Sequence, residues 1–341
     1  MTEAQHPRAA RILVGDIGGT NARFALYGHG DCERGGGALE ARATLAAADY
    51  LQFGDAVRAF LAKAGVETAA LYGASFAVAA PIGGDEIHFT NSPWRFSRRQ
   101  LAGDLGLTHL TVINDFEALA LRVPEMGDTD CALLREGVEI TGAPKLVLGP
   151  GTGLGVAGIV PLDPTGAIRW KPLPGEGGHV AFAPLDDFES DLLSYMRRQY
   201  ARVTVERLIC GDGLVAIHAF LLARSGASLL RAVTAANISR DALSGDNAIA
   251  REAVMRFLAM LGSFAGDCAL LYAARGGVYL GGGILPRLRP LLTSSQLFDR
   301  FDAKERMSPW ISQIPLKLVM DDGAALRGAA MAARQTPPDA H

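Results

Sequence analysis

Lysine is scarce in this chain of 341 residues, which contains only Lys63, Lys145, Lys171, Lys304 and Lys317. None of them follows a glycine, so the chain has no GxxxxGK[ST] phosphate-binding loop. The formal net charge is −3, so the chain lacks the basic excess that is typical of nucleic-acid binding. We therefore expect neither a Walker A nucleotide site nor a nucleic-acid partner.

The chain has only four cysteines, far apart in the sequence: Cys32, Cys131, Cys210 and Cys268. With no CxxC pair and no Cys/His cluster, they indicate reduced thiols in a reducing compartment. The longest apolar stretch, residues 69–82, is too short to span a bilayer. Residues 1–11 contain no apolar segment of a signal peptide. We expect a cytoplasmic protein without a membrane partner.

Glycine, in contrast, is abundant: the chain has 40, where an average usage of about 7% would give about 24. The glycines cluster beside apolar runs, which predicts tight turns at strand ends rather than a flexible linker. The hydrophobic fraction of 49% is typical of a well-buried globular protein. At about 150 residues per domain, the length favours two domains, with one large domain as the alternative.

Apolar periodicity predicts an α/β protein. In the first 122 residues the order is β-β-β-α-β-α-β, with strands at 12–16, 22–27, 41–45, 69–80 and 110–114 and helices at 51–64, 97–105 and 116–122. A second strand, Gly-rich turn and strand at 145–160 makes a weak internal repeat of the first hairpin. Further helices are expected at 191–200, 214–224, 248–274 and 324–334, and further strands at 278–280 and 316–320.

The first turn of small residues comprises Gly15, Asp16, Ile17, Gly18, Gly19 and Thr20. Glycines let backbone N–H groups approach phosphate oxygens, and the threonine adds a hydroxyl donor. Asp16, at the strand end, could hold Mg²⁺ through water, because oxygen ligands suit that ion. An ordinary tight hairpin explains the same pattern, so both interpretations stay open for this turn alone.

The second turn runs from residue 149 to residue 155 and includes Gly151, Thr152 and Gly153. Two such turns, each with a threonine, favour a pair of hairpins that clasp one polyphosphate. A third group of glycines, with Gly282 at its centre, follows the predicted strand 278–280. It would let a flat ligand such as adenine approach, but close packing of a strand on a helix explains it equally well.

Polar side chains stand at two other places. Asn114 and Asp115 follow a predicted strand, where an Asn can bind a hydroxyl group and an ionised Asp can accept a hydroxyl proton. A helix N-cap explains the pair as well. Glu176 and His179 flank two glycines, which disfavour a helix, and both could face one polar ligand or lie in a plain surface loop. The residues around Glu206 are typical of a solvent-exposed charge on a helix.

The chain resembles the bacterial hexokinase-type glucokinases through five motifs in the family's order: GDIGGTNAR at 15–23, INDFEALA at 113–120, GPGTGLGVA at 149–157, LPGEGGHVAFAP at 173–184 and GGVYLGGGILPR at 276–287. The resemblance covers residues 12–334. It implies the actin-like ATPase (ribonuclease H-like) fold, with two domains and a cleft between them. The small domain would comprise residues 1–122 and 321–341, and the large domain residues 123–320.

The resemblance also implies the reaction: ATP-dependent phosphorylation of D-glucose at its 6-hydroxyl, with Mg²⁺, by a cytoplasmic homodimer. It makes Asp115 the catalytic base and Asn114 a sugar ligand. Glu176, His179 and Glu206 would hold further sugar hydroxyls, so that for Glu206 the resemblance replaces the interpretation as a surface charge.

For the nucleotide, the resemblance makes residues 15–20 and 149–155 the phosphate hairpins. Two other functions stay open. A sugar-sensing regulator on the same fold is disfavoured by the presence of Asp115, and another actin-like phosphotransferase, acting on acetate or polyphosphate, is disfavoured by the Glu176/His179 loop. The repressor/kinase (ROK) sugar kinases usually carry a Cys-rich zinc motif, which this chain lacks.

Overall fold

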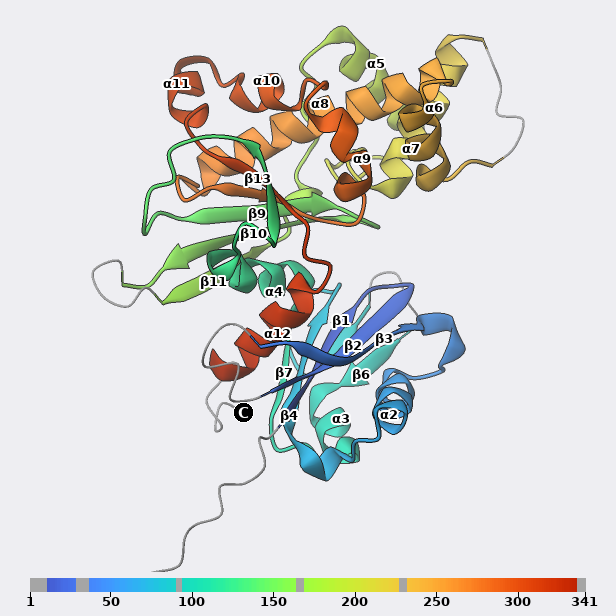
Figure 1. Cartoon of the computed structure of the whole chain (residues 1–341). Helices are drawn as coiled ribbons and strands as arrows, with labels where there is room; N and C mark the ends of the chain where they lie inside the picture. Colours follow the sequence, from blue (N-terminus) through green and yellow to red (C-terminus); the bar gives the residue numbers. More distant parts are fainter. Residues whose placement is uncertain (1–10, 29–36, 90–93, 164–168, 227–231, 336–341) are drawn as a thin grey trace, which may run out of the picture. The chain divides into compact units, whose positions relative to one another are not determined.

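The computed structural model describes residues 11–28, 37–89, 94–163, 169–226 and 232–335. The chain divides into two compact units, which we describe separately (Figure 1). Unit 1 comprises Met1–Glu125 and Asp321–His341, and unit 2 comprises Met126–Met320. Each unit is built around its own β-sheet.

Unit 1 contains a five-stranded sheet in the order β3-β2-β1-β4-β7. Its strands are β1 (Arg11–Ile17), β2 (Asn21–Gly28), β3 (Leu39–Ala46), β4 (Leu71–Val78) and β7 (Leu110–Asn114). The first three form an antiparallel meander, and β4 and β7 run parallel to β1. The predicted order of elements along the chain is confirmed, but the short hairpin of β5 (Glu86–His88) and β6 (Arg95–Ser97) was not foreseen.

One face of this sheet packs against α2 (Phe53–Ala64) and α3 (Arg98–Leu105). Alternate strand residues point to this side, and aromatic rings fill the space. The rings of Phe53 and Phe76 meet edge to face with centroids 5.0 Å apart. The predicted helix at 97–105 is confirmed, and Ser97 is its N-cap, because the Ser97 hydroxyl accepts a hydrogen bond from the Gln100 N–H at 3.0 Å.

The opposite face packs against α4 (Asp115–Arg122) and the last helix, α12 (Ala324–Gln335), as Figure 1 shows. The two helices cross with their backbones in contact, since a Cβ at Gly328 would overlap the carbonyl oxygen of Ala118. Ahead of α12, Arg42 on β3 donates to the Asp322 carboxylate at 2.7 Å, and this hydrogen bond lowers the pKa of Asp322. The C-terminal helix is therefore part of unit 1, although unit 2 precedes it in the chain.

Unit 2 contains a six-stranded sheet in the order β11-β10-β9-β12-β13-β8. Its strands are β8 (Cys131–Arg135), β9 (Lys145–Pro150), β10 (Leu154–Pro161), β11 (Trp170–Gly175), β12 (Val278–Leu280) and β13 (Leu316–Val319). Strands β9, β10 and β11 form a meander, with β12 and β13 parallel to β9. Apart from the edge strand β8, this is the strand order of unit 1, so the predicted internal repeat is confirmed.

The helices of unit 2 are α5 (Asp187–Met196), α6 (Gly211–Arg224), α7 (Ala235–Ser244), α8 (Ala248–Leu271), α9 (Leu285–Leu292), α10 (Leu297–Asp302) and α11 (Ser308–Ile311). The prediction of a helix at 191–200 was displaced by four residues. Asp186 is the N-cap of α5, and its side chain accepts a hydrogen bond from the Glu189 N–H at 2.8 Å. This acidic start carries little apolar periodicity, which is why the sequence pattern missed it.

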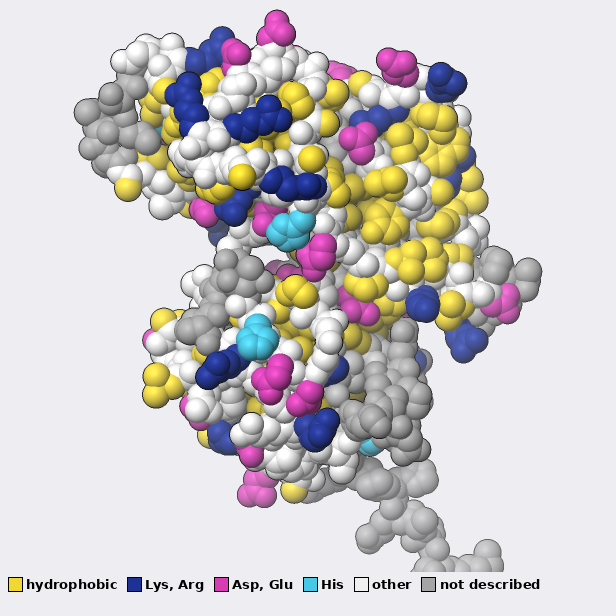
Figure 2. Space-filling model, turned by 180° about the vertical axis from the view of Figure 1, so that it is seen from behind, with side chains coloured by type: hydrophobic (Ala, Val, Ile, Leu, Met, Phe, Trp, Pro, Cys, Tyr) yellow, Lys and Arg dark blue, Asp and Glu magenta, His cyan; other side chains and the backbone are white. Residues whose placement is uncertain are grey.

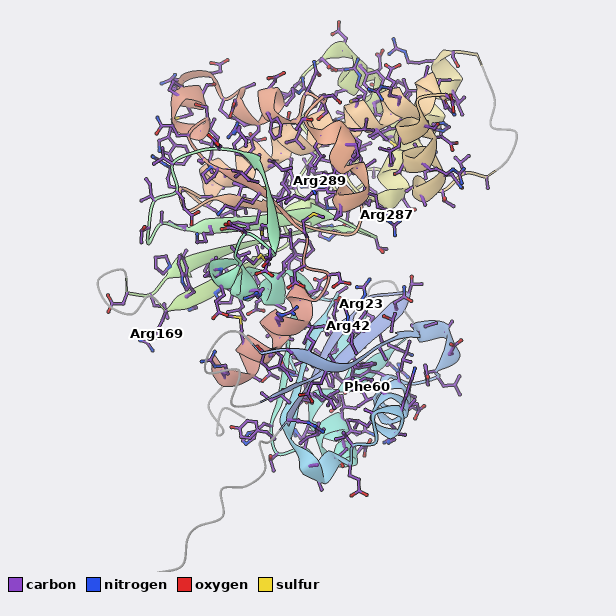
Figure 3. All side chains as sticks on the ribbon, in the orientation of Figure 1. Arg23, Arg42, Phe60, Arg169, Arg287 and Arg289 are labelled. Atoms are coloured by element: carbon purple, nitrogen blue, oxygen red, sulfur yellow. The ribbon has the colours of Figure 1, made fainter. Side chains whose placement is uncertain are left out.

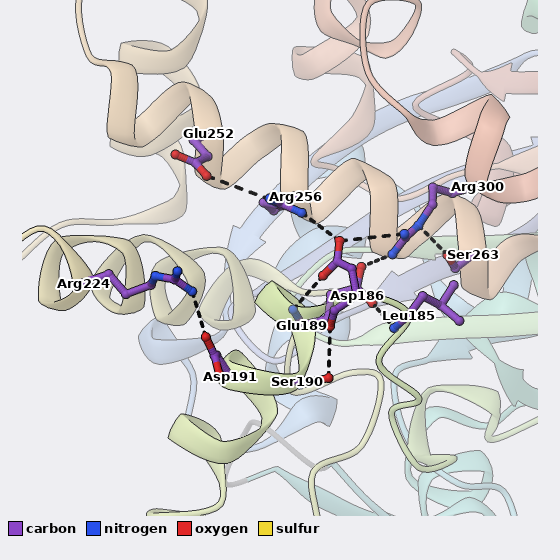
Figure 4. Close-up of polar contacts among 10 residues, drawn as sticks. All are labelled: Leu185, Asp186, Glu189, Ser190, Asp191, Arg224, Glu252, Arg256, Ser263 and Arg300. Atoms are coloured by element: carbon purple, nitrogen blue, oxygen red, sulfur yellow. Dashed lines mark hydrogen bonds and ion pairs between the residues drawn. The ribbon is translucent and has the colours of Figure 1, made fainter.

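A network of charged side chains joins α5, α8 and α10 (Figure 4). Glu189 is buried, pairs with Arg300 and accepts the Leu185 N–H at 2.8 Å. Arg256 of α8 donates to Asp186 at 2.9 Å. Burial raises the pKa of Glu189, while the charge of Arg300 acts in the opposite direction. These contacts link the three helices beyond their apolar packing.

Helix α8 is long and apolar enough to cross a membrane by length and composition, but 72% of its most apolar window is buried in unit 2. The same length and composition are found in the core helices of water-soluble proteins. Its residues Phe257, Leu258 and Leu261 belong to the main hydrophobic core of the unit. The helix is therefore weak support for any membrane association.

The helix crossing in unit 1 makes a prediction about stability. Gly328→Ala should lower the free energy of unfolding by about 1–3 kcal/mol, because the new methyl group must push α12 away from α4. Gly103→Ala is the matched control: Gly103 lies in α3, and a Cβ there meets nothing within 4 Å. That change should stabilise the protein by about 0.4–1 kcal/mol. Urea unfolding measures both, and equal effects would contradict the close crossing.

Candidate functional site

In unit 1, the carboxyl ends of three parallel strands lie side by side at one edge of the sheet. The register pairs Ile17 of β1 with Val78 of β4, and Val78 with Asn114 of β7. Neighbouring strands are about 4.8 Å apart, so the turn after β1 and the start of α4 lie about 10 Å apart along this edge. The structure thus brings the first Gly-rich turn and the Asn114-Asp115 pair to the same edge, where α/β proteins bind their ligands.

The turn between β1 and β2 is closed by a hydrogen bond from the Gly18 N–H to the Asn21 carbonyl at 2.9 Å. Gly19 and Thr20 lie at its tip, and Thr20 is exposed. The Ile17 side chain is fully buried in the core, so only its backbone faces the turn. Gly15 lies deeper in β1, where a Cβ would come within 2.7 Å of the Phe76 ring.

Asp16 has a partner that the sequence did not reveal. Its carboxylate Oδ2 accepts a hydrogen bond from Arg23 Nη1 at 2.8 Å, across the β1–β2 pair. Arg23 on β2 and Arg42 on β3 lie near each other at this edge of unit 1 (Figure 3). The register pairs position 16 with position 23, but a hairpin whose pairing is unknown offers no signal for such a contact.

Asn114 is the N-cap of α4. Its side-chain oxygen accepts hydrogen bonds from the N–H groups of Phe116 at 2.9 Å and Glu117 at 3.3 Å. The cap interpretation is therefore confirmed for Asn114, whose NH₂ group is not used by the cap. Asp115 is the first residue of α4; it is half-buried, and its Oδ1 accepts from the Phe116 N–H at 3.0 Å.

In unit 2, the end of β9 and the loop after β12 pack backbone against backbone. A Cβ at Gly149 would overlap the backbone of Gly281, and a Cβ at Gly282 would overlap the Pro150 carbonyl. Gly282 has a positive φ of 83°, which favours glycine. Gly151 is different, because a Cβ there would meet nothing within 4 Å.

The turn at residues 151–153 also contacts helix α6. The Gly151 N–H donates to the Gly153 carbonyl at 2.8 Å, and the Gly211 N–H at the start of α6 donates to the Gly151 carbonyl at 3.0 Å. Thr152 is exposed between them. Cys210 is the N-cap of α6, with its sulfur accepting from the Gly213 N–H at 3.3 Å. The contact of α6 with the turn was missed, because its Cys-Gly-Asp-Gly start lacks the usual capping residues.

Glu176 and His179 follow β11, whose carboxyl end lies at the same sheet edge as the end of β9. Residues Gly177–His179 form a single 3-10 turn and no α-helix, in agreement with the expectation that the two glycines disfavour a helix. Both side chains are exposed, and His179 Nε2 lies 3.7 Å from Glu176 Oε2. The turn thus brings the imidazole of His179 close to the carboxylate of Glu176.

Glu206 lies in a turn before α6, not on a helix, and it is half-buried. Its Oε2 accepts a hydrogen bond from the Leu154 N–H at 2.8 Å. Its own N–H donates to the Gly178 carbonyl at 2.9 Å. The interpretation as a solvated helix charge was therefore wrong. The preceding Val205 is buried, and this tertiary packing keeps the segment out of a surface helix.

Among the residues that the structure describes, no group of three or more His, Cys, Asp or Glu side chains is arranged to hold a metal ion. Cys131, Cys210 and Cys268 are free thiols, and Cys32 lies outside the described residues. Burial raises the pKa of Cys268 to about 12, so this thiol is inert at neutral pH. The candidate site residues thus form two groups, one in each unit, at the carboxyl edge of each sheet.

Comparison with known proteins gives a consistent picture. The family model described as Glucokinase matches residues 13–336. The glucokinase of Chromohalobacter salexigens is 45% identical over 324 residues, which cover 94% of this chain and 96% of that protein. The glucokinase of Chromobacterium violaceum is 41% identical and covers 95% of this chain and 89% of that protein.

Solved structures with a similar fold include two glucokinases. One, from an Antarctic psychrotroph, is 34% identical with a TM-score of 0.81, covering 96% of this chain and 100% of its own. The other, from Balamuthia mandrillaris, was solved in complex with glucose. It is 26% identical with a TM-score of 0.80, covering 95% of this chain and 94% of its own. A ROK family glucokinase from Streptomyces griseus, in complex with glucose and AMPPNP, has 18% identity and a TM-score of 0.63 over 96% of this chain and 100% of its own, a likeness of fold alone.

Proposed function

The chain belongs to the glucokinase family, which phosphorylates glucose at the expense of ATP, and we propose how its residues divide that reaction. Its fold is that of the actin-like ATPases. The observation that carries the proposal is the shared sheet edge in unit 1, where a Gly-rich turn and the Asn114-Asp115 pair end neighbouring parallel strands. The test is ATP consumption by the purified protein with and without glucose. Consumption that does not depend on glucose would refute the proposal.

Asp115 is the proposed general base. In the reaction, the glucose 6-hydroxyl oxygen bonds to the γ-phosphorus of ATP, the bond from that phosphorus to the β,γ-bridging oxygen breaks, and ADP leaves. Asp115 accepts the hydroxyl proton. Asn114 accepts the N–H groups of both Phe116 and Glu117, so the cap of α4 does not depend on Asp115 alone. The N-terminus of α4 stabilises negative charge, which suits a group that must be ionised to accept a proton.

The two Gly-rich turns are the proposed phosphate sites, with residues 15–20 in unit 1 and residues 151–153 in unit 2. At Gly151 a Cβ would have open space, and at Gly18 it would meet only the Asn21 carbonyl, at 3.6 Å. Packing within the protein therefore does not require glycine at either position. The N–H groups of Gly18 and Gly151 themselves close the two turns. Glycine at these positions leaves room for phosphate oxygens to approach the backbone at the turn tips. Gly282 packs against the backbone of Pro150, the residue directly before the second turn.

Magnesium fits the proposed site through Asp16. Only Oδ2 of this carboxylate is involved in the ion pair with Arg23, and the side chain is 18% exposed. Mg²⁺ in kinases is bound by one or two carboxylates, several waters and the substrate phosphates, so a single carboxylate suffices. When bound, the ion would neutralise charge on the phosphates of ATP. Backbone N–H groups and the ion held through Asp16 would then supply the positive charge that a lysine provides in a P-loop.

Glu176, His179, Glu206 and Asn114 are the proposed ligands of the sugar hydroxyls. Carboxylates accept hydrogen bonds from hydroxyl groups, and the Asn114 NH₂ group donates to them. Glu176 and His179 present their polar atoms 3.7 Å apart on one short turn, which suits two neighbouring hydroxyls. Groups of this kind would favour a polyhydroxylated substrate over acetate or polyphosphate.

The proposal includes a cytoplasmic homodimer. Unit 2 leaves several large hydrophobic side chains exposed, among them Leu271 (82%), Val138 (60%) and Leu133 (55%). Figure 2 shows hydrophobic side chains gathered over one side of this unit. Exposed apolar area of this kind is typical of surfaces that contact another protein, which supports association of two copies.

Asp115→Asn tests the catalytic base. The change keeps the shape of the side chain but removes the proton acceptor, so kcat should fall by about 10²–10⁴-fold. Asp187→Asn is the matched control, since Asp187 is likewise the first residue of a helix, α5. It should keep kcat, and both variants should keep the melting temperature. Near-normal kcat in a folded Asp115→Asn protein would contradict the assignment.

Glu176→Gln tests the sugar site. A hydrogen bond to a charged group contributes about 1.5–3 kcal/mol, so the glucose Kd should rise roughly tenfold or more while the ATP Kd stays the same. Calorimetric titration measures both constants. Glu252→Gln on α8, where the glutamate is similarly exposed, should change neither. Equal weakening of both ligands by Glu176→Gln would indicate a folding defect and count against the sugar role.

Gly151→Val tests the second phosphate turn. The new side chain meets no protein atom near its Cβ, so the melting temperature should stay near that of the wild type. It would occupy the space proposed for phosphate, and ATP should bind roughly tenfold more weakly or worse. Glucose affinity measured without nucleotide should be kept. Unchanged ATP binding would leave residues 151–153 as a plain turn.

A further inference from the structure

The carboxylate of Glu206 lies against the second Gly-rich turn. Its Oε2 accepts the Leu154 N–H at 2.8 Å, at the point where β10 begins. A Cβ at Gly153 would lie 2.5 Å from this oxygen and 4.0 Å from Oε1. The contact therefore requires glycine at position 153, for a reason that does not apply to Gly151. One carboxylate oxygen is engaged by the turn, and Oε1 is left for another ligand.

The backbone of the same segment holds the loop of Glu176 and His179. The Glu206 N–H donates to the Gly178 carbonyl at 2.9 Å, and the Val205 N–H donates to the Val180 carbonyl at 3.0 Å. Gly178 in turn packs on the backbone of Leu154, where a Cβ would overlap the Leu154 carbonyl. Residue 206 thus lies at the junction of the sugar loop and the phosphate turn, entirely within unit 2.

The negative charge of Glu206, as well as the position of its carboxylate, affects the second Gly-rich turn. An ionised carboxylate beside a loop that binds phosphate repels the phosphate, because like charges disfavour each other at short range. Hydroxyl groups that donate hydrogen bonds to the carboxylate spread and screen its charge. A sugar on Oε1 would therefore both fix the carboxylate in place and reduce its repulsion of a nucleotide.

We propose that Glu206 is a positioning residue that couples the two substrates: sugar bound to one carboxylate oxygen orders the phosphate turn, which the other oxygen holds through Leu154. The inference rests on the proposed function, in which Glu206 binds sugar and residues 151–153 bind phosphate. Coupling between two ligands is reciprocal, so nucleotide strengthens sugar binding by the same factor.

The first experiment moves the carboxylate without changing it. In Gly153→Ala, the added methyl group displaces Oε2, and the glucose Kd measured without nucleotide should rise about tenfold. In Gly151→Ala, two residues away in the same turn, the methyl group meets nothing within 4 Å, and the glucose Kd should stay within about twofold of the wild-type value. Equal glucose Kd values for the two variants would overturn the inference.

The second experiment measures the coupling itself and does not depend on whether Gly153→Ala folds. The AMPPNP Kd is measured calorimetrically with no glucose and at saturating glucose. In the wild type the ratio of the two constants should be about fivefold or more. In Glu206→Gln, whose amide oxygen still accepts the Leu154 N–H but carries no charge, the ratio should fall to about one.

Glu176→Gln is the matched control for this ratio. It weakens glucose binding as Glu206→Gln does, but its carboxylate is 60% exposed and pairs with His179. Its ratio at saturating glucose should equal that of the wild type. A ratio kept in Glu206→Gln, or lost to the same extent in both variants, would refute the coupling role. Failure of the wild type to bind glucose at all would instead refute the proposed function.

Discussion

Parallel pairing decides where the proposed binding residues lie. In unit 1, β4 and β7 run parallel to β1, and in unit 2, β12 and β13 run parallel to β9. Residues far apart in sequence, such as Asp16 and Asn114, therefore reach one sheet edge without any direct contact. The same rule brings the end of β9, at Gly149 and Pro150, against Gly281 and Gly282 after β12 in unit 2. The side chains determine the chemistry of each edge, whereas the parallel strand direction determines which residues lie there.

Much of this arrangement could be predicted from the sequence, because it depends on local patterns. The order of strands and helices along the chain in unit 1, the caps at Ser97 and Asn114, and the Gly-rich turns follow from apolar spacing and residue type over a few positions. The repeat between the units could be recognised only from its turns, since the strands of the two sheets share a pattern of burial rather than particular residues.

What the sequence concealed depends on contacts between distant segments. Glu206 has the neighbours of a surface charge, yet its carboxylate binds a backbone N–H 52 positions earlier. The pairing of Asp16 with Arg23 needs the hairpin register, and the glycine at 15 is explained only by the ring of Phe76. Glycines also differ in kind: those at 149, 153 and 282 make room for other protein atoms, whereas Gly151 faces open space. Sequence alone cannot separate these two uses.

The position of α12 has a consequence for the order of synthesis. Unit 1 begins the chain, but one face of its sheet, with Ile12, Val14 and Ala25, is covered in part by the side chains of Leu326 and Ala329. Those residues leave the ribosome only after all of unit 2. This face of the nascent first sheet therefore remains partly uncovered while about 200 further residues are translated. Unit 2 has no such dependence, so the later unit can complete its core before the earlier one.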